Sequence, residues 1–135
     1  MRRLFADSVY WIALASRKDQ WHQKAYELDH SLEGVQIVTT QEILTEFLTH
    51  FCEHGHYMRR SVLAFVESIS ADPGIVVRPQ SDRSFSSGLN LYKSRPDKEY
   101  SLTDCISMET MREEGIIEVL TRDSHFTQEG FTVLI

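Results

Sequence analysis

The chain has 135 residues, of which 41% are hydrophobic and 25% charged, and its formal net charge at pH 7 is −6. This length and composition predict a soluble globular protein with one domain over residues 1–135. No apolar run approaches the ~20 residues of a membrane helix, and the acidic balance argues against nucleic-acid binding by the whole surface, so any such contact needs local basic patches.

Cysteine content and the first residues of the sequence bear on the compartment. The start, Met1 to Asp7, has too short an apolar stretch for a signal peptide. Cys52 and Cys105 do not make a disulfide framework, which predicts a reducing cytoplasm. Histidines surround Cys52 in the sequence, but they lack the regular spacing and distant second ligand pair of a zinc site.

Short apolar runs without alternation predict buried parallel strands near residues 3–6, 36–39, 75–77, 118–120 and 131–134. Helical patterns lie near residues 8–16, 19–31, 41–54, 57–70, 82–94 and 102–114. Three glycines follow helical patterns and predict helix C-termini: Gly34, Gly55 and Gly115. The alternation predicts an α/β fold, a three-layer sandwich with a central, mainly parallel five-stranded sheet.

Acidic residues stand where such a fold gathers functional groups. Asp7 and Asp123 each follow a predicted strand, Asp104 opens a helix, and Glu46 lies inside one. In open α/β sheets the active crevice lies beyond the carboxyl ends of the strands. Hard cations prefer oxygen ligands, so the set predicts a site for Mg²⁺ or Mn²⁺.

Each carboxylate also has a local structural alternative. Asp7 would cap the helix that begins at Ser8, and Asp123 would form an Asx-turn. Asp104 has the capping-box spacing to Ser101. However, the helix after Asp104 carries apolar residues on more than one side, which predicts burial, and a buried carboxylate is costly unless a cation or donors compensate it.

The helix near residues 41–54 offers two glutamates. The sequence Thr39–Glu42 fits a capping box, which gives Glu42 a structural role. Glu46 falls on the flank of the apolar stripe, whereas Glu42 falls nearly opposite it. We therefore predict Glu46 as the site residue, with Glu42 held in reserve.

These pieces resemble the PIN domain, the ribonuclease fold of the VapC-type toxins. The resemblance spans essentially the whole chain, and it is carried by the order, spacing and setting of its pieces. The matching segments are Phe5–Ser8, Val38–Thr40 leading to Glu46, Leu102–Ser107, Leu120–Phe126 and Gly130–Phe131. An aromatic-rich segment from Trp11 to Trp21 departs from the family pattern.

The resemblance implies a Mg²⁺- or Mn²⁺-dependent endoribonuclease whose metals activate a water and stabilise charge on the phosphate. Its metal ligands, directly or through water, would be Asp7, Glu46, Asp104 and Asp123. Hydroxyls that would orient these carboxylates are on Ser8, Ser107 and Thr121, with local capping as the equal alternative.

The resemblance also implies partners, namely an RNA substrate, an antitoxin protein and a second copy of the chain. Aromatic residues for a homodimer face would be Trp11, Trp21 and Tyr57, with core packing as the stronger alternative. Basic residues between two tyrosines, just before the Asp104 helix, would track a single RNA strand: Lys93, Arg95 and Lys98. An exposed helix end and loop is the alternative for that segment.

Two other functional classes remain open from the sequence. One is a module that kept the fold and lost activity, and the presence of all four carboxylates argues against it. The other is a Mg²⁺-dependent phosphotransfer or receiver domain. A haloacid-dehalogenase-like enzyme needs a second aspartate where this chain has Val9, and a receiver domain needs a lysine that residues 121–123 do not supply.

Overall fold

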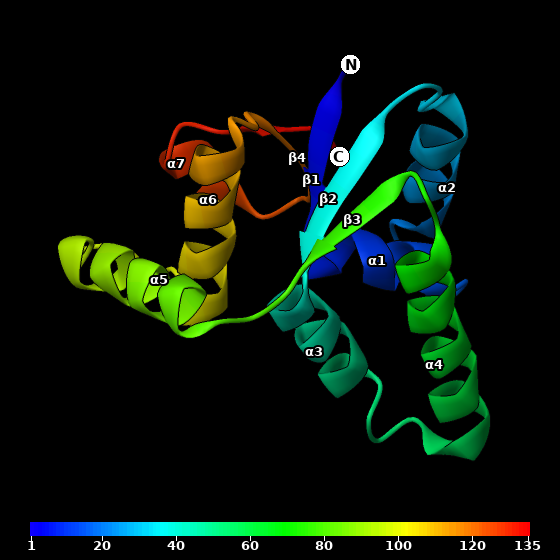
Figure 1. Cartoon of the computed structure of the whole chain (residues 1–135). Helices are drawn as coiled ribbons and strands as arrows, with labels where there is room; N and C mark the ends of the chain where they lie inside the picture. The colour runs from blue at the N-terminus through cyan, green and yellow to red at the C-terminus, as the bar shows by residue number, and fades with distance from the viewer.

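A five-stranded sheet in the order β3-β2-β1-β4-β5 runs through the middle of the molecule in the computed structural model, which describes residues 1–135 (Figure 1). Every neighbouring pair of strands is parallel. The strands are β1 (Arg3–Ala6), β2 (Gln36–Thr40), β3 (Ile75–Arg78), β4 (Glu118–Leu120) and β5 (Thr132–Val133). The strand predictions are confirmed within one or two residues, and the predicted α/β sandwich is confirmed with an all-parallel sheet.

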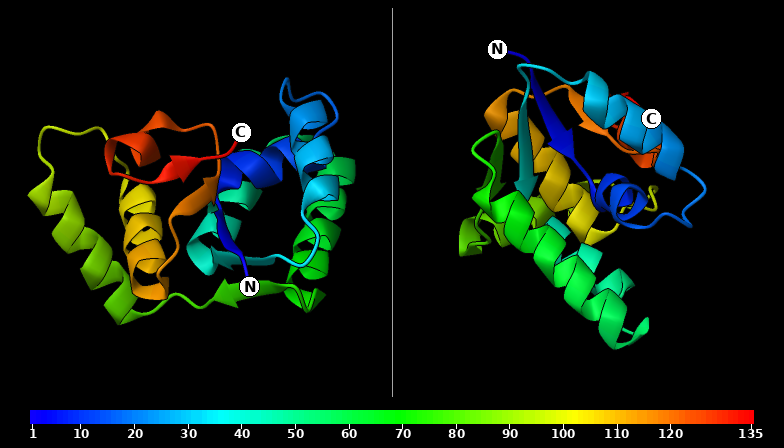
Figure 2. Two further views of the ribbon diagram at one scale, coloured as in Figure 1. Left: turned by 90° about the horizontal axis from the view of Figure 1, so that it is seen from above. Right: turned by 90° about the vertical axis from the view of Figure 1, so that its right-hand side faces the viewer.

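Helices cover both faces of the sheet, as parallel strands require. Figures 1 and 2 show α5, α6 and α7 on one side and α1, α2 and α4 on the other, while α3 lies below the strand ends. The helices are α1 (Ser8–Ala15), α2 (His22–Ser31), α3 (Gln41–His50), α4 (Gly55–Ala71), α5 (Asp82–Ser94), α6 (Leu102–Glu114) and α7 (Ser124–Gln128). No helix is both long enough and apolar enough to cross a membrane.

The order in which strands are added to the sheet reverses between β1 and β4. The chain moves outward from β1 through β2 to β3, and then returns to place β4 on the other side of β1. Right-handed crossovers put the helices of the two halves on opposite faces. In such folds the functional crevice lies at the carboxyl ends of the two strands on either side of this point, which are β1 and β4 here. In register terms, Phe5 pairs with Val119 and Ala6 with Leu120, so Asp7 and Thr121 emerge side by side from the sheet.

Two helix features differ from the sequence prediction, and one predicted helix end is confirmed. Gly55 was expected to end a helix but begins α4, because α3 already ends at His50. Gly115 does end α6, in the left-handed conformation (φ 68°) that glycine adopts without strain. The short helix α7 was not predicted at all, since five residues are too few to show a helical period.

Aromatic and aliphatic side chains fill the space between the layers. Tyr10, Phe5, Phe47 and Phe126 are completely buried. Trp11 is also buried, at 3% exposure, and it stacks edge-on against Phe65. The prediction that Trp11 helps to form an exposed dimer face is therefore wrong, and its stated alternative of core packing is correct.

Helix α5 is held mainly by α6. Gly88 of α5 is buried and faces α6 at very close range, since a Cβ built at this position would lie 2.4 Å from Cγ1 of Ile106. Glycine is required at this crossing because any side chain would force the two helices apart.

Candidate active site

Asp7 is the most buried carboxylate of the crevice, at 2% exposure. It occupies the position before α1, but its side chain makes no capping hydrogen bond, so the predicted capping alternative is wrong. Instead, Oδ2 accepts a hydrogen bond from Oγ1 of Thr121 at 2.8 Å. Burial, together with the nearby charges of Asp104 and Glu46, raises the pKa of Asp7 to about 7.

Glu46 enters the crevice from α3, on the side of the helix that faces α1. The hydroxyl of Ser8 donates a hydrogen bond to its Oε1. Burial raises the pKa of Glu46, and the charges of Asp104 and Asp123 raise it further. Both charges act on Glu46 only because the three carboxylates lie close to one another.

Glu42 lies outside this cluster. The residue that caps α3 is Thr40, whose Oγ1 accepts from the amide of Ile43 at 3.1 Å, so the predicted capping box ending at Glu42 is wrong. The Glu42 carboxylate instead accepts from the Ser84 hydroxyl at 2.9 Å and lines a polar cavity of about 410 Å³ beside α5. The geometry therefore favours Glu46 over Glu42.

Asp104 lies at the third position of α6. Its Oδ2 accepts from the amide of Ser101 at 3.0 Å, and its own amide donates to Oγ of Ser101 at 3.0 Å. The predicted capping box is thus present, but it does not remove the carboxylate from the crevice. Burial raises the pKa of Asp104, and the charge of Asp123 adds to that effect.

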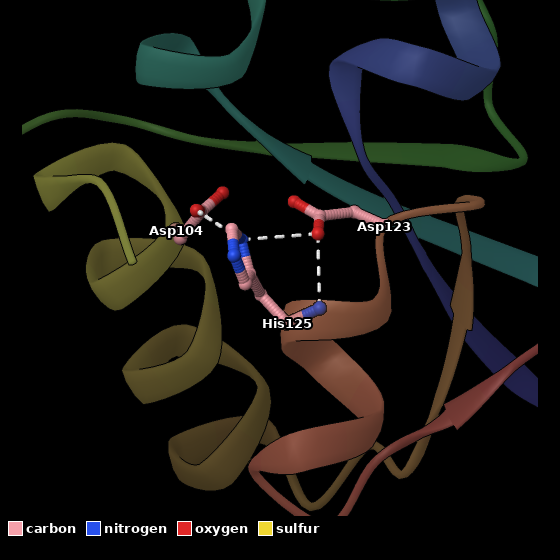
Figure 3. A group of neighbouring side chains, drawn as sticks. All are labelled: Asp104, Asp123 and His125. Atoms are coloured by element: carbon pink, nitrogen blue, oxygen red, sulfur yellow. Dashed lines mark hydrogen bonds and ion pairs between the residues drawn. The ribbon is translucent and has the colours of Figure 1, made fainter. Parts of the chain in front are cut away.

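Asp123 and His125 complete the cluster from the start of α7 (Figure 3). Oδ1 of Asp123 accepts from the amide of His125 at 2.9 Å, as an Asx-turn predicts. The ring Nδ1 of His125 lies 3.1 Å from Asp123 Oδ1 and 3.6 Å from Asp104 Oδ2, yet it has no partner with hydrogen-bond geometry. His125 is not among the site residues predicted from the sequence, because its distance to Asp104 depends on the packing of α7 against α6.

The hydroxyls predicted to orient the carboxylates divide into two groups. Thr121 holds Asp7 and also accepts from the amide of Asp123 at 3.1 Å, and Ser8 holds Glu46. Ser107 is fully buried on α6, but its Oγ has no hydrogen-bond partner in the protein. Two of the three predicted hydroxyls therefore touch the carboxylates directly.

The donor set fits a divalent cation. Three of the four carboxyl groups have raised pKa values, so a positive charge placed among them would stabilise their ionised forms. One ligand atom from each of Asp104, Asp123 and His125 lies within 4.8 Å of the others. Oxygen-rich sites suit Mg²⁺ and Mn²⁺, and no comparable cluster forms among the histidines near Cys52.

The segment predicted to bind RNA is only partly free to do so. Lys93 is exposed near the end of α5, and Nζ of Lys98 lies 3.6 Å from Oδ2 of Asp97. Arg95, however, donates to both carboxylate oxygens of Glu129 at 3.0 and 2.9 Å. Its charge is held by that carboxylate, so Arg95 has a structural role here, and RNA binding by this segment stays a prediction.

No protein-family model and no curated protein sequence matches the chain. Similar solved structures include VapC20 of Mycobacterium tuberculosis, a Sarcin-Ricin loop cleaving toxin, with 23% identity, a TM-score of 0.85 and 96% of both chains covered. FitAcB from Neisseria gonorrhoeae has 13% identity and a TM-score of 0.69, with 98% of this chain and 96% of that chain covered. DNA-bound VapBC from Salmonella typhimurium has 14% identity and a TM-score of 0.68, with 99% and 98% covered. The chain therefore has the PIN-like α/β fold of these proteins, as the sequence predicted.

Proposed function

We propose that the chain is a metal-dependent endoribonuclease that hydrolyses RNA phosphodiester bonds, with its active site in a single domain over residues 1–135. The observation that carries this proposal is that four carboxylates lie close together at the point where the strand order reverses. Support also comes from the fold shared with VapC20, which cleaves the Sarcin-Ricin loop.

The chemistry requires a water to attack phosphorus while the bond from phosphorus to the departing oxygen breaks. A divalent cation, when bound, would lower the pKa of that water and stabilise charge on the phosphate. The carboxylates that would hold the cation are Asp7, Glu46, Asp104 and Asp123. Either Mg²⁺ or Mn²⁺ fits this oxygen-rich set.

The protein's own contribution is positioning. Thr121 and Ser8 fix the orientation of Asp7 and Glu46 through direct hydrogen bonds. The capping contacts at Ser101 and at the start of α7 fix Asp104 and Asp123. Carboxylates that are held in this way lose little conformational entropy when they bind a cation and an RNA phosphate.

The proposed partners follow from the same comparison. One similar structure is a VapBC assembly bound to DNA, which supports an antitoxin protein as a partner of this chain in the cytoplasm. A groove of about 400 Å³ between α3 and α4 offers an apolar surface, with Leu63 at 52% exposure. A homodimer is a further proposal, for which Tyr57, at 78% exposure, is an available contact.

The test is cleavage of total cellular RNA by the wild type and by Asp7→Asn, each with Mn²⁺ and with EDTA. The wild type should yield fragments that require the cation, and Asp7→Asn should yield none of them. Asparagine keeps an acceptor for Thr121 and removes the charge, so loss of cleavage would not reflect a lost fold. Identical fragment patterns from the two proteins would overturn the nuclease proposal.

A further inference from the structure

Half of the basic residues have no carboxylate within ion-pair distance. Of the 14 lysines and arginines, seven form ion pairs with acidic side chains. Those without an acidic partner are Arg17, Lys18, Lys24, Arg59, Arg60, Lys93 and Arg122. Four of these residues lie near Trp21: Arg122, and Arg17, Lys18 and Lys24 of the segment 17–24.

The guanidinium group of Arg122 lies over the ring of Trp21. Its guanidinium carbon is 3.3 Å from the centre of the indole ring, and Nζ of Lys24 is 5.5 Å from the same centre. The indole is a favourable surface for a cation, and stacking holds the guanidinium plane in place. The N–H groups at its edge accordingly stay free for an external acceptor, because the side chain makes no hydrogen bond within the protein.

The loop that carries Trp21 is well fixed. Oδ1 of Asp19 accepts from the amide of Trp21 at 2.8 Å, and the amide of Asp19 donates to the carbonyl of Ser16 at 3.1 Å. The ring Nδ1 of His22 lies 2.7 Å from the carbonyl oxygen of Ala13. The only acidic residue of the loop is thus bound to the backbone, and the basic side chains are presented on an ordered support.

The place of Arg122 links this surface to the acidic crevice. It stands between Thr121, which holds Asp7, and Asp123. Its exposed side chain therefore leaves the backbone directly beside two of the carboxylates. An RNA strand whose cleaved phosphate lies at these carboxylates would place its next nucleotide over Arg122.

We propose that Arg122 stacked on Trp21, with Lys24 and the basic loop residues Arg17 and Lys18, binds the phosphodiester backbone of the RNA strand beside the cleaved bond. The inference rests on the proposed function and adds the surface that holds the substrate. A guanidinium edge binds a phosphate with two parallel hydrogen bonds, and its plane supports a stacked base. This surface supplies local positive charge beside the carboxylates in a chain whose net charge is −6.

The test measures binding of a fluorescent single-stranded RNA oligonucleotide to the Asp7→Asn protein, which cannot cleave it. Arg122→Gln in that background should weaken binding by about 5- to 10-fold and lower the salt slope by about 0.7. Arg122→Lys should keep the slope and lose part of the affinity, since it keeps the charge and loses the plane. Lys24→Gln, on the exposed face of α2, should act in the same direction as Arg122→Gln.

The matched control is Arg60→Gln on α4, an exposed and unpaired arginine away from Trp21, which should leave RNA binding unchanged. Equal RNA binding by Arg122→Gln and its parent, or no RNA binding by either, would overturn the inference. If the wild type cleaves RNA while Arg122→Gln binds normally, the nuclease proposal stands and this surface is excluded. If binding depends on Arg122 but no cation-dependent cleavage occurs, the surface stands and the nuclease proposal falls.

Discussion

Replacing Asp7 with asparagine should make the metal-free protein more stable at alkaline pH. The carboxyl group is buried and has a pKa raised to about 7 from 3.8. In the folded protein it therefore binds a proton more tightly than in the unfolded chain. Its contribution to stability is fully present below pH 3.8 and is lost as the pH rises through about 7.

The size of the effect follows from the difference in pKa. Each unit corresponds to about 1.4 kcal/mol, so the rise from 3.8 to about 7 sets a limit of about 4 kcal/mol for Asp7 alone. Burial also raises the pKa values of Glu46 and Asp104, so their contributions to the free energy of unfolding are likewise lost as the pH rises. A change of this size in a domain of this length corresponds to roughly 15 °C in melting temperature.

The assay is urea unfolding of both proteins, stripped of metal with EDTA, between about pH 5 and pH 8.5. The free energy of unfolding of the wild type should fall across this pH range. That of Asp7→Asn should fall much less, so the variant should be the more stable protein at pH 8.5. Glu129 has a pKa that is lowered to about 2, so its opposite effect on stability occurs far below this pH range. A wild type that is equally stable at both ends, or an Asp7→Asn protein that is less stable throughout, would refute the reasoning.

Three further predictions concern the cation and the packing. Saturating Mn²⁺, at about 100 times its Kd, should stabilise the wild type by about 2.7 kcal/mol at pH 8, and Asp104→Asn should lose most of that shift in thermal melting. Glu129→Gln should cost about 2 kcal/mol in urea unfolding, because it leaves two half-exposed arginines without their carboxylate. Gly88→Ala should cost about 1–3 kcal/mol in the same assay, because its Cβ would overlap Ile106, whereas a value near zero would mean that α5 moves freely on α6.

The fold was accessible from the sequence because local patterns and global topology agree. Buried strands without alternation predicted a parallel sheet, and parallel strands place residues such as Asp7 and Asp123 at one edge. Helical periodicity and the capping box predicted for Glu42 both favour Glu46 as the site residue, and the structure places Glu46 near Asp104 and Asp123. The positions of residues that follow strands or lie at helical spacing can thus be predicted from one sequence.

Other features depend on contacts between elements that are distant in the sequence. The pairing of Arg95 with Glu129 requires the loop after α5 to meet the end of α7. The stacking of Arg122 on Trp21 likewise joins the end of β4 to the loop after α1. Neither contact has a sequence period or a local motif, so no single-sequence argument predicted them. The predicted capping box from Thr39 to Glu42 is wrong because two adjacent threonines offer two possible helix starts, and only Thr40 caps α3.

The central claim is that Asp7, Glu46, Asp104 and Asp123 together bind the divalent cation used for catalysis. Its most direct test is anomalous X-ray diffraction from crystals of the protein soaked in Mn²⁺. We expect a peak in the crevice between β1 and β4, with metal–oxygen distances of ~2.0–2.6 Å to carboxylate oxygens of this set or to waters that these carboxylates bind. A fully soaked crystal with no peak there, or with its peak only at the histidines near Cys52, would contradict the claim.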